Sequence, residues 1–94
     1  MKIGTTIREL RRNKNMAQVE LAKRTGLSQT SISLIESNEV RPHQSTIKKI
    51  CKVLQCSEPV LYLLSITEQD VPKQKRVKFN KEWLNIKIQI QQLL

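Results

Sequence analysis

The sequence predicts an all-α fold of five short helices, followed by an amphipathic helix at the C-terminal end. Two observations favour this class. Glycine occurs only twice and proline three times among 94 residues, which leaves few candidate β-turns. Apolar residues recur instead every three to four positions, which is the period of a helix that buries one face.

The first helix is expected from about Gly4 to Lys14. Its apolar side chains are spaced at i, i+4 and i+7 and belong to one face: Ile3, Ile7 and Leu10. Asn15 comes directly after this helix, and asparagine tolerates the left-handed conformation that commonly ends one. The second helix, from about Gln18 to Arg24, directs Leu21 and Ala22 inward.

A tight turn is expected at Gly26, because glycine adopts a positive φ without Cβ strain. Ser28 is a good N-cap for the third helix, whose buried edge is formed by Ile32 and Ile35. A loop from Ser37 to Pro42 separates this helix from the fourth.

The fourth helix spans about Gln44 to Leu54, with apolar residues inward and lysines outward. The inward set is Ile47, Ile50, Cys51 and Leu54, and the outward set is Lys48, Lys49 and Lys52. Ser57 is expected to cap a fifth helix, and Pro59 fits the first turn of that helix. Its apolar contacts are expected from Val60, Leu63 and Leu64.

Three regions are predicted: a domain over residues 1–66, a basic linker over 67–79 and a tail helix over 80–94. The tail allows two periods, because alternate residues from Leu84 to Ile90 are apolar as in a strand. A helix instead gathers five apolar residues on one stripe: Trp83, Ile86, Ile90, Leu93 and Leu94. We favour the helix, with Asn80 as its N-cap, because a lone strand would expose an unpaired edge.

The chain is strongly basic, with 17 Lys and Arg against 8 Asp and Glu and a formal charge of +9. The cations flank residues 25–40, in which Glu36 and Glu39 are the only charged residues. Uncharged polar side chains in residues 25–40 suit a helix that contacts bases, while the basic segments on either side suit contacts with phosphates. The three aromatic residues are not spaced for base stacking, so double-stranded DNA is favoured over single strands.

Other classes of function find little support. One histidine, no Cys–His motif and no glycine-rich phosphate loop argue against an enzyme, a cofactor or a small-molecule ligand. The C-x4-C spacing of Cys51 and Cys56 matches no metal site, so we expect no metal and interpret both as reduced structural thiols, with a disulfide or redox switch as the alternative. No apolar run approaches 18 residues, so we expect a cytoplasmic protein without a membrane partner.

The region from Gln18 to Ile35 resembles the helix-turn-helix of Cro/cI-type repressors, the xenobiotic-response-element class. The matching residues are Gln18, Leu21, Ala22, Gly26, Leu27, Ile32 and Ile35. Each has a mechanical reason: the alanine is small where two helices cross, the glycine makes the turn, and the large apolar residues bury the corner. The resemblance extends from about Ile3 to Leu64 and implies a five-helix, repressor-like DNA-binding domain.

The third helix is expected to read the major groove. On a helical wheel, Thr30, Ser33, Leu34 and Ser37 lie opposite the buried edge, and Gln29 lies at the N-terminal end. With the resemblance, this assigns base contacts to Ser28, Gln29, Thr30, Ser33 and Leu34. Glutamine can bond adenine bidentately, and the hydroxyls of serine and threonine can donate or accept. For Leu34, contact with a thymine methyl and plain surface exposure both stay open.

Contacts to the DNA backbone follow from the same resemblance. They fall on Gln18, Ser31, Ser37, Arg41 and His43, although the loop that carries the last two departs from the family in length and sequence. The resemblance also pairs Arg11 with Glu36 in a structural salt bridge between the first and third helices.

The start of the tail, Phe79 to Trp83, looks like the helix start in the oligomerisation segments of the biofilm and sporulation repressors of Bacillus. An apolar stripe in so small a protein favours a partner helix, and we expect a homodimer. The sequence thus predicts a homodimeric bacterial or phage transcription regulator, a repressor on a palindromic operator, with autoregulation or control of a restriction-modification system as specific forms. The alternative is an antitoxin whose tail binds a toxin or antagonist protein.

Overall fold

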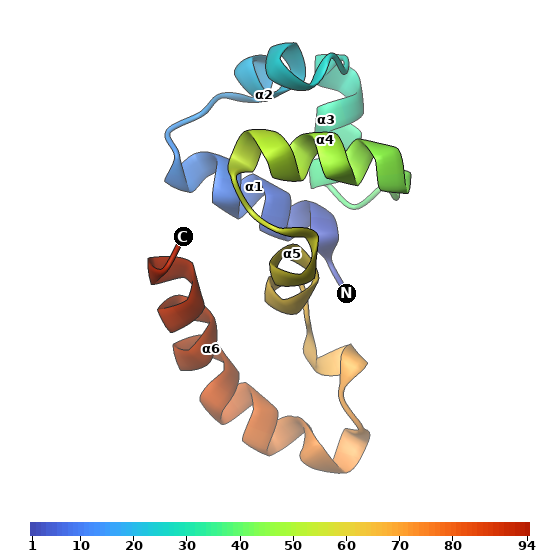
Figure 1. The fold of residues 1–94 in the computed structure, drawn as a ribbon. Helices are drawn as coiled ribbons and strands as arrows, with labels where there is room; N and C mark the ends of the chain where they lie inside the picture. Colours follow the sequence, from blue (N-terminus) through green and yellow to red (C-terminus); the bar gives the residue numbers. More distant parts are fainter.

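Five α-helices form a domain in the first two-thirds of the chain, and a sixth follows after two short 3-10 turns (Figure 1). The computed structural model describes residues 1–94 and contains no strand. The elements are α1 (Ile3–Asn13), α2 (Gln18–Thr25), α3 (Gln29–Glu36), α4 (Gln44–Leu54), α5 (Glu58–Leu64), η1 (Glu68–Asp70), η2 (Lys73–Lys75) and α6 (Arg76–Gln92). The all-α prediction is therefore confirmed, and α6 is a helix rather than a strand.

The core lies wholly between the first five helices and their connections. It consists of Ile3, Ile7, Leu10, Met16, Leu21, Ala22, Ile32, Ile35, Ile47, Ile50, Cys51, Leu54, Cys56, Leu61 and Leu64. α1 contacts α3, α4 and α5, and α2 contacts α3 and α4. This arrangement surrounds one side of α3 with apolar side chains and leaves its other side open.

Asn15, Gly26 and Ser28 have the predicted conformations, whereas Ser57 precedes α5 without a capping hydrogen bond from its side chain. Asn15 and Gly26 have φ values of 54° and 75°, in the left-handed region. The hydroxyl of Ser28 accepts a hydrogen bond from the backbone N–H of Ser31 at 3.0 Å, and so it caps α3. Gln55, with φ 55°, ends α4 in the same way without having been predicted.

The fifth helix buries a different face from the one expected. Leu61 and Leu64 are its buried residues, whereas Leu63 is 40% exposed and Val60 is only half-buried. The expectation of contacts from Val60, Leu63 and Leu64 is therefore wrong for Leu63. Leu61 and Leu64 are three residues apart and lie on the side of α5 that faces α1 and α4. In this orientation of the helix, Leu63 is directed toward solvent.

The sixth helix begins at Arg76 and not after Asn80. Pro72 opens the turn η2, which leads directly into the helix, and the following Lys and Arg residues have high helix propensity. Asn80 consequently lies inside the helix, where its amide donates to Glu68 Oε2 at 2.7 Å instead of capping. None of the helices combines the length and the hydropathy that spanning a bilayer requires.

The start of α1 packs directly against the end of α3. A Cβ on Gly4 would lie 1.9 Å from the carbonyl oxygen of Ile35, and this oxygen belongs to the backbone, which cannot swing aside. Only glycine therefore permits this approach of the two helices.

We predict that Gly4→Ala destabilises the domain by about 1–3 kcal/mol through overpacking. The expected change in the free energy of unfolding is opposite to the usual one, because Gly→Ala inside a helix ordinarily stabilises by about 1 kcal/mol. Gly26→Ala is the matched control: no atom lies within 4 Å of its Cβ, so it costs only left-handed backbone strain, about 1–2 kcal/mol. Thermal or denaturant unfolding measures both. A Gly4→Ala protein as stable as wild type would show that α1 and α3 can separate at no cost.

Candidate nucleic-acid interface

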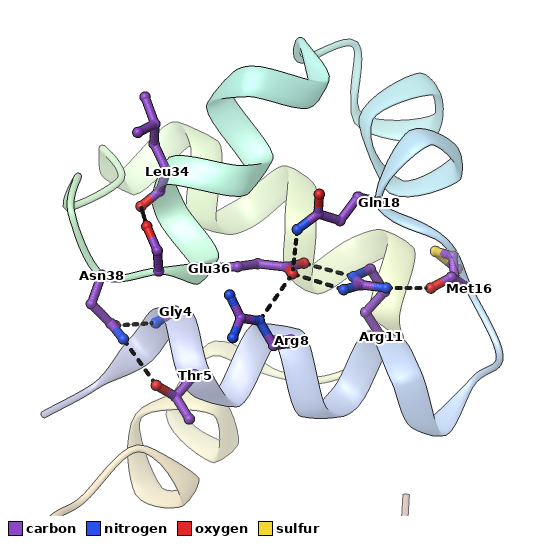
Figure 2. Close-up of polar contacts among 10 residues, drawn as sticks. Gly4, Thr5, Arg8, Arg11, Met16, Gln18, Leu34, Glu36 and Asn38 are labelled. Atoms are coloured by element: carbon purple, nitrogen blue, oxygen red, sulfur yellow. Dashed lines mark hydrogen bonds and ion pairs between the residues drawn. The ribbon is translucent and has the colours of Figure 1, made fainter.

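The orientation of α3 depends on a buried ion pair between Arg11 and Glu36 (Figure 2). Arg11 Nε lies 2.7 Å from Glu36 Oε2, and Arg11 Nη2 lies 2.8 Å from Oε1, so the contact is bidentate. The two side chains are 7% and 0% exposed. The pair joins the last turn of α1 to the last residue of α3.

Two further groups complete this cluster. Gln18, the first residue of α2, donates its amide N–H to Glu36 Oε1 at 3.0 Å. Arg11 Nη1 donates to the backbone carbonyl of Met16, in the connection from α1 to α2, at 2.6 Å. One carboxylate thus holds α1, α2 and α3 together.

The hydrogen bonds keep Glu36 ionised in spite of its burial. Burial by itself raises the pKa of Glu36, but the bonds from Arg11 and Gln18 and the positive charges of Arg11 and Arg8 outweigh it, and the pKa lies below its ordinary value. The bond to Glu36 likewise raises the pKa of Arg11. Both groups carry their charges at neutral pH.

Arg8 is a member of this cluster that the sequence argument did not identify. Its Nε lies 3.6 Å from Glu36 Oε1 and has no hydrogen-bond partner, although this nitrogen is buried. The signal in the sequence is the spacing of Arg8 and Arg11, because residues three apart lie on the same face of a helix.

Asn38 is a second unpredicted residue, and it fixes the loop after α3. Its φ of 63° is left-handed, a conformation that asparagine tolerates. Its Oδ1 accepts from the backbone N–H of Gly4 at 3.0 Å, and its Nδ2 donates to the hydroxyl of Thr5 at 2.9 Å (Figure 2). The loop that leads to Arg41 and His43 is thereby tied to the start of α1.

Four of the five residues predicted to contact bases lie side by side. Gln29, Thr30, Ser33 and Leu34 line one shallow hollow of about 300 Å³, together with Gln18 from α2. We call the exposed side of α3 formed by Gln29, Thr30, Ser33 and Leu34 the reading face. Ser28 is also exposed, but its hydroxyl lies 2.9 Å from that of Ser31 and is engaged in the cap.

Three of the five predicted phosphate contacts lie together, and the other two lie apart. Ser31, Arg41 and His43 line a second hollow of about 260 Å³ between α3, the following loop and the start of α4. Ser37 does not line it, and its hydroxyl donates to the Leu34 carbonyl at 3.1 Å. Gln18 lies beside the reading face, with its amide group directed inward to Glu36.

Leu34 stands between the two hollows and lines both. Its side chain is half-buried and points away from the Glu36 cluster (Figure 2). Leu34 therefore gives this surface an apolar group, and contact with a thymine methyl and plain surface exposure both stay open.

Neither cysteine belongs to this surface. Cys51 and Cys56 are free and buried, and burial, with a smaller contribution from Cys56 and Glu58, raises the pKa of the Cys51 thiol to about 11. Such thiols stay protonated and unreactive at neutral pH. No three His, Cys, Asp or Glu side chains come together in a way that would hold a metal ion.

Comparison with known proteins agrees with this geometry. The sequence model of a helix-turn-helix family matches residues 7–61, more than half of the chain. The ImmF control region 10 kDa protein of Bacillus phage phi105 is 32% identical over 65 residues, which cover 69% of this chain and 72% of that protein.

A second relative is longer than this chain. The HTH-type transcriptional regulator PuuR of Escherichia coli K12 is 29% identical over 79 residues, which cover 84% of this chain but only 40% of PuuR. PuuR of Shigella flexneri matches equally well. No solved structure matches the chain.

We predict that Glu36→Ala lowers the free energy of unfolding by about 3–5 kcal/mol, because it leaves the Arg11 charge buried and unpaired. Glu39→Ala is the matched control, since Glu39 is an exposed carboxylate three residues away and a surface change costs within about 0.5 kcal/mol. Denaturant unfolding distinguishes them. Equal stability of the two variants would show that the buried pair does not hold the helices.

The same pair predicts a dependence on acid. The folded pKa of Glu36 lies below its ordinary value of 4.5, so its stabilising contribution is complete above that value and is lost as the pH falls toward the folded pKa. Wild type should therefore lose stability faster than Glu36→Ala below about pH 4.5. Parallel pH curves would contradict the lowered pKa.

Proposed function

Because the chain belongs to the Cro/cI-type helix-turn-helix family of DNA-binding transcriptional regulators, we propose that it is a homodimeric repressor that reads a palindromic operator in the major groove. The observation that carries this proposal is the reading face. Gln29, Thr30 and Ser33 are exposed, uncharged and adjacent, on a helix whose opposite side is locked into the core. Side chains of this kind match base edges, which present both donors and acceptors.

The second hollow supports a backbone contact beside the reading face. Arg41 supplies positive charge, and Ser31 and His43 supply polar groups next to it. Contacts of this type set the position of the protein on the duplex without reading its sequence. The formal charge of +9 adds attraction for DNA that weakens as salt is added.

The tail supports assembly of two copies. Of the predicted stripe on α6, Ile86, Leu93 and Leu94 are 44%, 86% and 49% exposed, while Trp83 and Ile90 are half-buried. A second copy would cover these side chains, and a two-fold dimer would present two copies of α3 about 34–36 Å apart, one turn of the duplex. An operator of two inverted half-sites suits such a dimer.

Repression would follow if the operator overlaps a promoter, since a bound dimer excludes other proteins from the same duplex. The names of two similar proteins concern control in general, one the control region of a phage and the other transcriptional regulation. These relatives support a role in control of gene expression.

We predict that Gln29→Ala and Thr30→Ala each lower discrimination between operator and altered operators by about 1–3 kcal/mol per lost base contact. Arg41→Ala is the matched control on the neighbouring hollow. It should weaken binding to all duplexes about equally and reduce the dependence on salt by about one phosphate contact. Titration of a set of single-substitution duplexes measures both effects. Unchanged preference in the two α3 variants would refute the reading face.

We also predict that truncation after Asp70 leaves a folded, monomeric domain that binds operator weakly. The fifteen core residues all lie before Ser65, and the ion pair between the N-terminal ammonium and Asp70, at 3.0 Å, is kept. Loss of the link between two half-site binders costs about 10²–10⁴-fold in avidity. Sedimentation and operator titration check this. A truncated protein that stays dimeric with wild-type affinity would move the interface to α5, around Tyr62 and Leu63.

A further inference from the structure

α6 contacts the rest of the chain through polar side chains and through Ile90. Arg76 Nε donates to the carbonyls of Glu68 and Val71 at 2.9 and 3.2 Å. Near the other end, Lys87 Nζ lies 3.4 Å from Glu9 Oε2, and Gln91 donates weakly to the same oxygen at 3.5 Å. Among the apolar residues of α6, Ile90 is the one that packs against the core.

The apolar side of α6 has the spacing of a coiled-coil seam. Its members are separated by four, three, four and three residues: Phe79, Trp83, Ile86, Ile90 and Leu93. This spacing assigns Trp83 and Ile90 to heptad position a, and the other three to position d. The rings of Phe79 and Trp83 stack along the seam with their centroids 5.4 Å apart.

A groove runs beside this seam and remains open. It has a volume of about 390 Å³, and Phe79, Trp83 and Ile86 form its apolar wall together with Val71. Glu82, Lys75 and Lys78 also line it. A groove of this kind accepts the side chains of a facing helix, as knobs enter holes.

The charges that flank the seam fit a second copy in one direction only. Glu82 occupies position g, and Lys87 occupies position e of the next heptad. In a parallel pair of identical helices, position g of one helix faces the following e of the other, so Glu82 meets Lys87 of the second copy twice. In an antiparallel pair, g faces g and e faces e, so Glu82 meets Gln89 and Lys87 meets Asn80 or another Lys87.

We propose that α6 forms a parallel two-stranded coiled coil with α6 of a second copy, through the seam from Phe79 to Leu93. The proposal rests on the proposed homodimer and names its interface and direction. On assembly, Lys87 exchanges Glu9 of its own domain for Glu82 of the second copy, and Ile90 exchanges its contact with the core for the facing helix. This exchange is available because Lys87 is held in the monomer by a single contact of 3.4 Å to a carboxylate that is 41% exposed.

Site-specific cross-linking of the full chain tests the direction. Leu93→Cys places a thiol at position d of the seam, where a parallel pair brings the two copies of one residue together. Val77→Cys is the matched control, because it lies off the seam at position b and is equally exposed, 83% against 86% for Leu93. Oxidised glutathione serves as the oxidant. The native thiols are buried, and wild type measures their background.

The expected result is a covalent dimer in Leu93→Cys and only background in Val77→Cys. Cross-linking of Val77→Cys alone would place the interface on the opposite side of α6 and overturn the proposal. Absence of cross-linking in both would also overturn it, and would leave an antiparallel pair or another protein as the occupant of the groove.

Charge exchange gives a second, independent test. Glu82→Lys and Lys87→Glu should each weaken the homodimer, on the order of fivefold per lost pair, and the two variants mixed should form a heterodimer at wild-type affinity. The variant that carries both changes should form a homodimer with the affinity of wild type. Sedimentation measures all four. A dimer that is insensitive to both single changes would contradict the parallel direction. Failure of the wild-type protein to bind a half-site in duplex DNA would instead indicate that the proposed function is wrong.

Discussion

The buried contact of Arg11 with Glu36 is the interaction on which the rest of the DNA-binding domain depends. Glu36 ends α3, and its two oxygens receive hydrogen bonds from α1 and from the first residue of α2. A carboxylate without these partners would not stay ionised in the core. Correct placement of three helices is thus a condition for burying the charge, and the same placement directs the reading face outward.

The buried and the exposed sides of α3 have different roles. Ile32 and Ile35 are almost fully buried and anchor the helix to a core shared by all five helices. Ser28 fixes where α3 begins, and Asn38 fixes where the chain goes after it. Gln29, Thr30 and Ser33 carry no structural contact of this kind, so their identities are free to match a base sequence. The folded backbone holds these side chains in place, and for the proposed base contacts this would lower the entropic cost of binding.

Much of this could be predicted from the sequence because the signals are local. Turn residues such as Gly26 and periodic apolar residues such as Ile47 and Ile50 set the helices, and the wheel of α3 separates Thr30 and Ser33 from the core. The remainder depends on distant contacts. The face of α5 that buries Leu61, the pairing of Asn38 with Gly4, and the buried nitrogen of Arg8 follow from how helices meet in space. The start of α6 at Arg76 follows from the turn at Pro72. The polar composition of residues 67–79 indicated a linker instead.

The most direct test of the account is selection of bound duplexes from a random pool by the full chain. If α3 reads bases and α6 joins two copies, the enriched sequences contain two inverted half-sites whose centres lie about one duplex turn apart, 10–10.5 base pairs. Single base changes within a half-site then lower affinity by about 1–3 kcal/mol each. Enrichment of no sequence, with binding that depends only on salt, would contradict the claim that α3 presents a reading face to the major groove.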